Sequence, residues 1–591
     1  MKRPVVPAIV AIAVTALATL PVPPTSAQPP QLPVVPSVAP GYRAPDVAPT
    51  QAQIVGVTQQ PFVGISLQDA IAMALLKNPD LAVSASNVRV ARYTIVEAKG
   101  AYDLQLQLKP SSSFSVSPPQ NAFEAGPGEL GRYSPGPAST PGVIFTTGPG
   151  NIVQHQSSFQ YGVGGQTENG MTYQAGIQQS RTYNNTVFDA YNPYYIATLN
   201  LAVTQPLLKN AGMNANKRQL KLAFVNEDAK AAQALIDASN TIAQVEDAYW
   251  QLVAAWRNVA IQEEALGEAI AQQQSNVRLA RRGEAAYVDA VESETQVETF
   301  RDDVYSALQN VSALQNQLKD LVVTDAADPI WRANLVPSTS VQQLPTASDL
   351  ATIVAEGRQH RPEMLQARAK AHQADIDRAF AKNQSLPQAD LKAQYLSNGF
   401  AGLLTPVPPF LTNVCSQAAL TACPTPPPQT QGTMAFAYHN MWAAYFPTFN
   451  VALIVGYPLQ ANLARGERGV AAEETRQAAI LMQGVAVRIG AEARIALQAY
   501  QSGLARLDAA RRSRESAEAV YASEVRKFHA GASTTFLVLQ RQVELAQARG
   551  QELTAQTDLN QAIVELHRVD GSILTENGVD LRTLGSRALA R

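Results

Sequence analysis

Two long blocks of the sequence have an apolar pattern with the period of an α-helix. Blocks 207–328 and 459–591 contain no proline and are rich in alanine, glutamine, glutamate, arginine and leucine, which favour helices. Apolar residues recur three and four positions apart in both blocks. A continuous helix over 207–282 would be about 110 Å long, so it needs equally long neighbours to pack against. The apolar stripes include Tyr249, Leu252, Val253 and Trp256 in the first block and Val520, Val525 and Phe528 in the second.

Each block is interrupted once, at a glycine that follows basic residues. Gly283 comes directly after Arg281 and Arg282, and Gly531 comes shortly after Lys527. A glycine after a basic last turn is a signal for the end of a helix, and the helical pattern resumes beyond both glycines. Each block is therefore predicted to fold as a helix, a tight turn and a returning helix.

Four other segments alternate apolar and polar residues with the period of a β-strand. Strands that are apolar on one side and polar on the other are typical of membrane barrels; a soluble β-sandwich is the alternative, but helices of this length favour the barrel. The first half has a further alternating pair, 159–163 and 171–175, within the segment 110–198. This pair is either an added hairpin at the outer surface or an extension of the barrel wall. The four segments are 104–109, 199–204, 391–395 and 449–455.

The two halves of the chain repeat the same features in the same order, which indicates a duplication. The predicted fold class is a mixed α+β membrane protein, internally duplicated. Its long α-helical hairpins form an α-barrel, and its strands belong to a transmembrane β-barrel. The matched positions are Asn78-Pro79 with Arg361-Pro362, Gln205-Pro206-Leu207 with Tyr457-Pro458-Leu459, and Gly283 with Gly531.

The N-terminus has the features of a secretory signal. Lys2 and Arg3 precede an apolar stretch that ends in small residues at Ala27, where cleavage is expected; an uncleaved anchor helix is the alternative. The expected parts of the chain are a signal peptide (1–27), a Pro-rich flexible lead-in (28–64), a first structural repeat (65–323), a linker (324–346), a second structural repeat (347–574) and a C-terminal tail (575–591).

Composition excludes several functions. The chain has 46 Lys and Arg against 48 Asp and Glu, so no basic field favours a nucleic-acid partner. The six histidines have no metal-ligand spacing, and common phosphate-loop, nucleophile-elbow and zinc-pair motifs are absent. We therefore expect no enzyme activity, catalytic residue, metal or cofactor. Cys415 and Cys423 lie close together in a Pro-rich segment; they can form a disulfide in an oxidising compartment, and two free thiols are the alternative.

This order of features resembles the TolC-like outer-membrane efflux proteins over nearly the whole mature chain. The segment 201–210 is similar to that family's strand-to-helix transition, and Asn78-Pro79-Asp80-Leu81 is similar to its first-helix motif. The resemblance implies a homotrimer in outer-membrane lipid, in which each chain gives four strands to a twelve-stranded barrel and the helices extend into the periplasm. It further implies passive passage through the exit duct of an efflux or type I secretion system. A periplasmic adaptor (membrane fusion) protein would couple this duct to an inner-membrane pump.

The resemblance also places the functional residues at the two hairpin turns. In that family the turns form the periplasmic mouth, which is closed at rest and contacted by the adaptor. The implied adaptor-contact candidates are Gly283, Glu284, Ala285, Gly531, Ala532 and Ser533.

The returning helices carry the implied gate. By alignment on the turn glycines, acidic gate candidates fall on Asp289 and Glu292, and three copies would form a carboxylate ring that can bind cations. The second hairpin has Leu537 and Gln540 at these positions, which predicts a more apolar constriction there. A solvated charged helix face is the alternative for Asp289. The arginines expected to pair with the acids are Arg281 and Arg282.

Two other classes of protein explain part of the pattern. A periplasmic coiled-coil structural or adaptor protein would have the long helices but not the alternating strands. A secreted adhesin would have the signal and strands but not the repeated long hairpins. Because a polar, water-filled duct is largely unselective, the sequence does not determine the transported substrate, the pump or the adaptor.

Overall fold

The computed structural model describes residues 61–118, 151–186, 189–284, 286–323, 325, 327–339, 349–405 and 426–579. All of them lie in one compact unit, Ala44–Arg591. The expected signal peptide, both cysteines and Ala285 lie outside the described residues.

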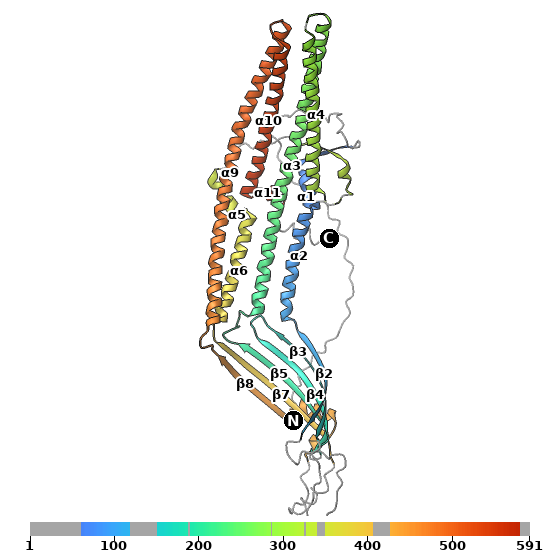
Figure 1. Ribbon diagram of the computed structural model, residues 1–591. Coiled ribbons are helices and arrows are strands. Elements are labelled where there is room, and N and C mark those ends of the chain that lie inside the picture. The colour runs from blue at the N-terminus through green and yellow to red at the C-terminus, as the bar shows by residue number, and fades with distance from the viewer. Residues whose placement is uncertain are drawn as a thin grey trace, which may run out of the picture. The chain divides into compact units, whose positions relative to one another are not determined.

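The predicted helical hairpins are present in both halves (Figure 1). The hairpin helices have matching lengths: α3 and α9 have 67 and 68 residues, and α4 and α10 have 36 each. This match agrees with the predicted duplication, which stays a prediction. The helices of the first half are α1 (Leu67–Lys77), α2 (Pro79–Lys99), α3 (Ala215–Arg281) and α4 (Tyr287–Val322). Those of the second half are α5 (Leu350–His360), α6 (Pro362–Gln384), α9 (Asn462–His529), α10 (Thr535–Asp570) and α11 (Ser572–Glu576).

The matched Asn-Pro and Arg-Pro pairs separate two helices in each half. Asn78 ends α1, and its side-chain oxygen accepts hydrogen bonds from the first turn of α2, where Pro79 is the first residue. Arg361 likewise ends α5, but without a side-chain cap, and Pro362 begins α6. Proline fits the first turn of a helix because its missing N–H would have no helical partner there.

The first long helix begins later than predicted, at Ala215 instead of Leu207. Residues 207–214 form an irregular segment in which Asn210 and Gly212 have positive φ, 66° and 69°. The backbone N–H of Leu207 donates to Ala389 O, at 2.7 Å. Asn214 then caps α3 by accepting a hydrogen bond from Lys217 N. Tertiary hydrogen bonds therefore replace the helix that the local pattern favours.

The main apolar core surrounds the middle of α3 and contains the first predicted stripe. Tyr249 and Leu252 are 0% exposed, and Trp256 is 3% exposed. These side chains also hold a small parallel sheet of β1 (Phe62–Ile65) and β6 (Asn334–Pro337): Tyr249 Oη donates to Ile65 O and Trp256 Nε1 to Leu335 O, at 3.1 and 2.9 Å. The second stripe is not a core stripe within one chain, because Val520 is 44% exposed.

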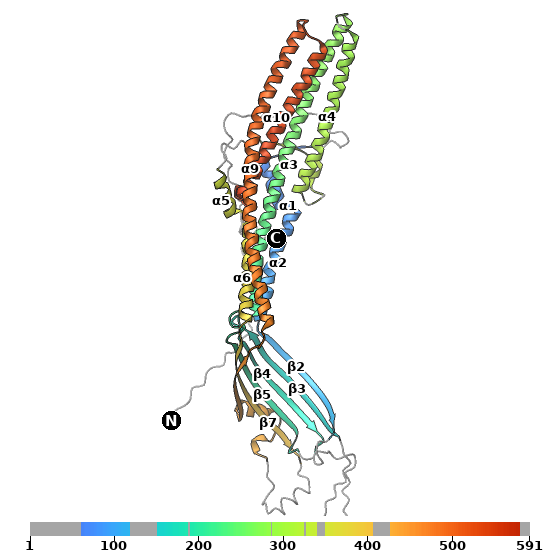
Figure 2. The ribbon, with the colours of Figure 1, turned by 60° about the vertical axis from the view of Figure 1, so that its left-hand side comes forward.

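The strands that lie between α2 and α3 and between α6 and α9 in the sequence form one six-stranded antiparallel sheet (Figures 1 and 2). Its strand order is β2-β3-β4-β5-β7-β8. The expectation of four strands per chain is therefore wrong for this sheet: the extra pair lies inside it, between β2 and β5. The strands are β2 (Gln105–Ser117), β3 (Ile152–Gln166), β4 (Thr172–Asn184), β5 (Tyr191–Pro206), β7 (Gln388–Leu404) and β8 (Phe446–Gly456).

A short helix, α8 (Met434–Trp442), packs against β5 and β7. It approaches the sheet so closely that a Cβ on Gly399 would lie 1.8 Å from Ala437 O. Single 3-10 turns lie at Gly100–Tyr102, Pro329–Arg332 and Pro428–Thr430. Within the described ranges, the structure has no helix whose length and apolar character would let it span a membrane.

Candidate channel wall and hairpin turns

The six-stranded sheet has one apolar face and one polar face. Residues directly opposite each other in paired strands share a face, so each row of paired residues can be followed across all six strands. One row is Leu106, Val163, Ala175, Leu201, Tyr395 and Phe449. A row on the other face is Lys109, Gln160, Gln178, Thr198, Asn398 and Phe446. Apart from Phe446 at the edge, that second row is polar, as expected for a wall between lipid and water.

The β3–β4 hairpin is hydrogen-bonded at its turn to the cap and the first turn of α3. Asn214 Nδ2 donates to Glu168 O at 3.1 Å, and Asn216 Nδ2 donates to Gln166 Oε1 at 2.7 Å. Gly170 in this turn has φ +90°, and a Cβ there would lie 2.6 Å from Asn210 O. The turn therefore has a fixed place beside the first turn of α3.

The two outer strands of the sheet, β2 and β8, each have one paired side only within the described residues. Both carry exposed apolar side chains, among them Leu106 and Phe449, which are 69% and 72% exposed. The helices next to these strands in sequence, α2 and α9, also carry exposed apolar side chains. Their most exposed apolar residues include Val83, Val90, Tyr93 and Val96 on α2 and Leu463, Leu481, Val487 and Ile495 on α9.

The two hairpin turns have the same backbone geometry. Gly283 and Gly531 both have φ +74°. In the first turn Gly283 N donates to Ala280 O and Glu284 N to Leu279 O, at 3.0 and 2.9 Å. In the second, Gly531 and Ala532 make the same two bonds, to Phe528 and Lys527. This is the Schellman pattern, in which glycine supplies the left-handed residue.

The first-turn gate candidates are close in sequence but not paired with each other. The Asp289 carboxylate accepts a hydrogen bond from Ala286 N at 3.2 Å and so caps α4, while Glu292 is exposed. Arg281 and Arg282 are exposed too, and among the described residues neither forms an ion pair with the two acids. Within one chain, Asp289 therefore has a structural role that leaves its second carboxylate oxygen available.

The candidates of the second turn have different surroundings. Leu537 is 36% exposed, and Gln540 donates to Glu544 at 3.1 Å. Ser533 Oγ donates to Glu524 Oε1 at 2.5 Å, and Lys527 Nζ bonds to the other oxygen of this carboxylate at 3.0 Å. Of the adaptor-contact candidates, Glu284 and Ala532 are exposed together with both glycines.

Sequence reasoning missed the exposed apolar residues beside both turns. Tyr287 and Val288 on α4 are 80% and 58% exposed, and Phe536 on α10 is 63% exposed. They directly follow the two turns, so the signal was an apolar residue at matching offsets after each glycine. Exposed large apolar side chains beside each turn make both turns candidates for a binding surface.

Comparison with known proteins finds solved structures that are similar to this chain. No protein-family model and no curated protein matches this sequence. The outer-membrane channel OprN matches with a TM-score of 0.55 at 16% identity, covering 90% of this chain and 98% of its own. A membrane protein from Pseudomonas aeruginosa matches with a TM-score of 0.57 at 16% identity, covering 90% and 97%. The outer-membrane channel CmeC of Campylobacter jejuni matches with a TM-score of 0.56 at 13% identity, covering 88% and 89%.

The chain has the TolC-like outer-membrane channel fold. Because the matches cover nearly all of each solved chain, both the sheet and the helical hairpins belong to the likeness. At these identities it is a likeness of fold.

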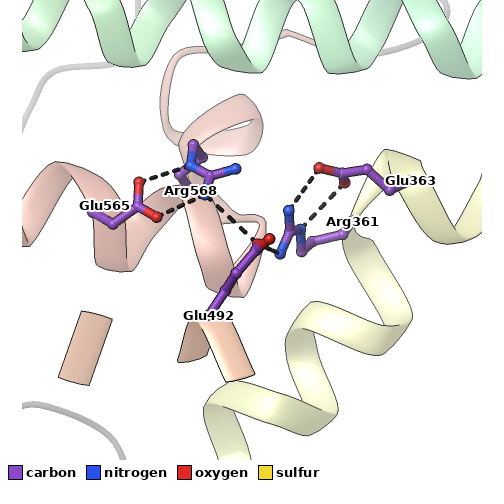
Figure 3. Close-up of polar contacts among 5 residues, drawn as sticks. All are labelled: Arg361, Glu363, Glu492, Glu565 and Arg568. Atoms are coloured by element: carbon purple, nitrogen blue, oxygen red, sulfur yellow. Dashed lines mark hydrogen bonds and ion pairs between the residues drawn. The ribbon is translucent and has the colours of Figure 1, made fainter. Parts of the chain in front are cut away.

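Within this TolC-like fold, an ionic cluster around the buried Arg361 joins α6, α9 and α10 (Figure 3). The Arg361 side chain is 4% exposed and forms ion pairs with Glu363 and Glu492, at 2.6 and 2.5 Å. Glu492 lies between Arg361 and Arg568, which is 3.6 Å away and also pairs with Glu565 at 2.6 Å. Burial acts to raise the pKa of Glu363, but the hydrogen bond and charge of Arg361 outweigh it and lower that pKa.

A second group of titratable residues in the TolC-like helices lies where α3 meets α10 and α11. Burial raises the pKa of Glu246 to about 7 and that of Asp247 to about 6. Asp247 Oδ1 is buried and has no hydrogen-bond partner in the described part of the chain. His567 Nδ1 lies 3.0 Å from a Glu576 oxygen; burial lowers the pKa of His567, but the bond to Glu576 outweighs it and the net shift is upward.

Proposed function

We propose that this chain is one protomer of a homotrimeric outer-membrane channel that serves as the exit duct of an efflux or type I secretion system. The observation that carries this proposal is the sheet with one apolar and one polar face, whose outermost strand β8 is followed within a few residues by the 68-residue helix α9. A wall of this kind can face lipid on one side and water on the other. The fold of known outer-membrane channels supports the same function.

The open edges of the sheet support assembly from several copies. Unpaired strand edges are not stable in lipid, because their backbone N–H and C=O groups find no water there. In a sheet of six antiparallel strands the two outer strands run in opposite directions. The β8 edge of one copy can therefore pair in antiparallel fashion with the β2 edge of the next. Such a head-to-tail contact gives a ring when the rotation between neighbouring copies closes.

The hairpin turns are the proposed contact for a periplasmic adaptor, which would couple the duct to an inner-membrane pump. The exposed apolar residues Tyr287, Val288 and Phe536 support this assignment, together with the exposed turn glycines. Passage would be passive, with Asp289 and Leu537 as candidate gate residues on the two returning helices.

Membrane fractionation and gel migration test the assembly. The protein should be recovered with outer membranes, and it should migrate in SDS as a trimer before boiling and as a monomer afterwards. A protein recovered only from the soluble periplasmic fraction, or a monomer in mild detergent, would support the coiled-coil alternative instead.

A further inference from the structure

We infer that three copies of this chain close one barrel of eighteen strands, six from each copy, in which the β3–β4 hairpin is part of the wall. This inference rests on the proposed trimer. It departs from the twelve strands that the resemblance implies, because the hairpin stands between β2 and β5.

Both strands of the hairpin are paired with their neighbours over almost their whole length. Every residue of β2, from Gln105 to Ser117, is paired with a residue of β3. β3 is paired with β4 from Gln154 to Gln166, and β4 is paired with β5 from Thr172 to Thr182. A hairpin lying on the outer surface would leave β2 paired with β5, and no such pair is present among the described strands.

The hairpin also carries the same two faces as the rest of the wall. Val163 and Ala175 continue the apolar row between Leu106 and Leu201, and Gln160 and Gln178 continue a polar row. A shift of one residue in register would reverse the faces of a strand. Because both hairpin strands keep the faces in register, they fit the same boundary between lipid and water as their neighbours.

Contacts at the turn and in the middle of the two strands hold the hairpin in the plane of the sheet. At its turn it is bonded to the start of α3, through the cap residue Asn214 and through Asn216 in the first turn of the helix. Farther along the strands, Tyr438 of α8 donates to Gln179 Oε1 on β4 at 2.5 Å, and its Oη lies 3.4 Å from Tyr161 Oη on β3. The hairpin is therefore attached to elements from both halves of the chain.

Two glycines allow the backbones of β3 and β4 to approach closely. Gly162 and Gly176 lie directly opposite each other, and a Cβ on Gly162 would lie 2.7 Å from Ala175 O. Glycines within strands allow the sharp bending that a closed barrel needs.

A barrel of eighteen strands would have a wider exit than one of twelve. Barrel diameter grows roughly linearly with strand number, so this barrel would be roughly one and a half times as wide as a twelve-stranded one. The added lining is uncharged, with side chains such as Ser158, Gln160, Gln174 and Gln178 on the polar face.

Disulfide trapping tests the position of the hairpin in the assembled protein. Ser111 Oγ and Ser158 Oγ are 2.6 Å apart across β2 and β3. In a Cys415→Ser/Cys423→Ser background, the pair Ser111→Cys/Ser158→Cys should oxidise readily and lose its reactivity toward a maleimide. The matched control is Ser111→Cys/Ile196→Cys, in the same row on β5 but two strands farther away, roughly 14 Å from β2; it should keep both thiols.

The outcomes separate this inference from the proposed function. Cryo-electron microscopy of the same trimers should resolve eighteen strands in the barrel wall. A trimer that conducts ions but traps the 111/196 pair, or that has twelve strands in its wall, would overturn the inference and leave the channel function standing. If the cysteine-free background forms neither trimers nor channels, the proposed function fails and the eighteen-stranded barrel fails with it.

Discussion

Arg361 and Glu492 form an ion pair of 2.5 Å between the break that separates α5 from α6 and the middle of α9. The arginine side chain is 4% exposed, so removing it would leave Glu363 and Glu492 without their main partner. Breaking a fully buried ion pair costs about 3–5 kcal/mol; because Glu363 and Glu492 are 29% and 27% exposed, the loss here should be smaller. We expect Arg361→Met to lower the midpoint of thermal unfolding well below that of the unaltered protein.

The matched control for this change is Arg301→Met. Arg301 pairs with Glu298 three residues away on α4, and both side chains are largely exposed, so the change should cost no more than about 0.5 kcal/mol. Equal effects of the two substitutions would contradict a stabilising role for the ionic cluster around Arg361.

The raised pKa of Glu246 predicts that stability falls as pH rises. The folded chain holds the proton of Glu246 up to about pH 7, whereas an unfolded chain releases it near pH 4.3. The contribution of Glu246 to the stability of the folded chain is therefore fully present below about pH 4.3 and is lost as pH rises through about 7. Asp247 and His567, whose pKa values are also raised, act in the same direction.

Glu246→Gln tests this pH dependence. The amide cannot ionise, so the variant should be more stable than the unaltered protein at pH 8 by on the order of 2 kcal/mol, and the difference should shrink toward pH 5. Thermal unfolding across this pH range is the measurement. A variant that is destabilised equally at every pH would mean that the carboxyl group itself is needed for packing.

Because the turn glycines have positive φ, we expect any other residue at these two positions to lower the stability of the folded chain. Nothing lies within 4 Å of a Cβ at Gly283 or Gly531, so the cost comes from backbone conformation alone, about 1–2 kcal/mol for alanine. Gly283→Ala should increase amide hydrogen exchange in residues next to the turn. Gly267→Ala is the control, since Gly267 lies inside α3 with open space around it, and alanine should stabilise that helix by about 0.5–1 kcal/mol.

The gate proposal for Asp289 is tested best by asparagine. Asp289→Asn keeps a side-chain oxygen for the hydrogen bond from Ala286 N but removes the charge. If three copies form a carboxylate ring, block of the channel by divalent cations should weaken while thermal stability changes little. Glu294→Gln, on the same helix and exposed, should leave the block unchanged. Weakened block in both variants, or in neither, would place the gate elsewhere.

Local signals in the sequence were sufficient for the helical hairpins. The turn glycines, the prolines after Asn78 and Arg361, and the stripe around Tyr249 all occupy the predicted places. In each case the conformation depends on residues a few positions apart in sequence, or the pattern follows the helical period. Four of the strands were predicted in the same way, because alternation identifies a strand and its two faces.

Contacts between distant residues were not predictable from such signals. Alternation in β3 and β4 indicates two faces but not which strands are neighbours, so the place of the hairpin came only from the structure. The segment before α3 loses its helical conformation to bonds with residues far along the chain, as between Leu207 and Ala389. Arg361 and Glu492 are likewise brought together only by the packing of α5, α6 and α9.

Single-channel recording in planar lipid bilayers tests the central claim most directly. Purified trimers should insert and produce stable ionic conductance in discrete steps of equal size. Protein that is shown to be folded and trimeric but never conducts would contradict the channel function, and it would favour a structural protein of the periplasm built from the same long helices.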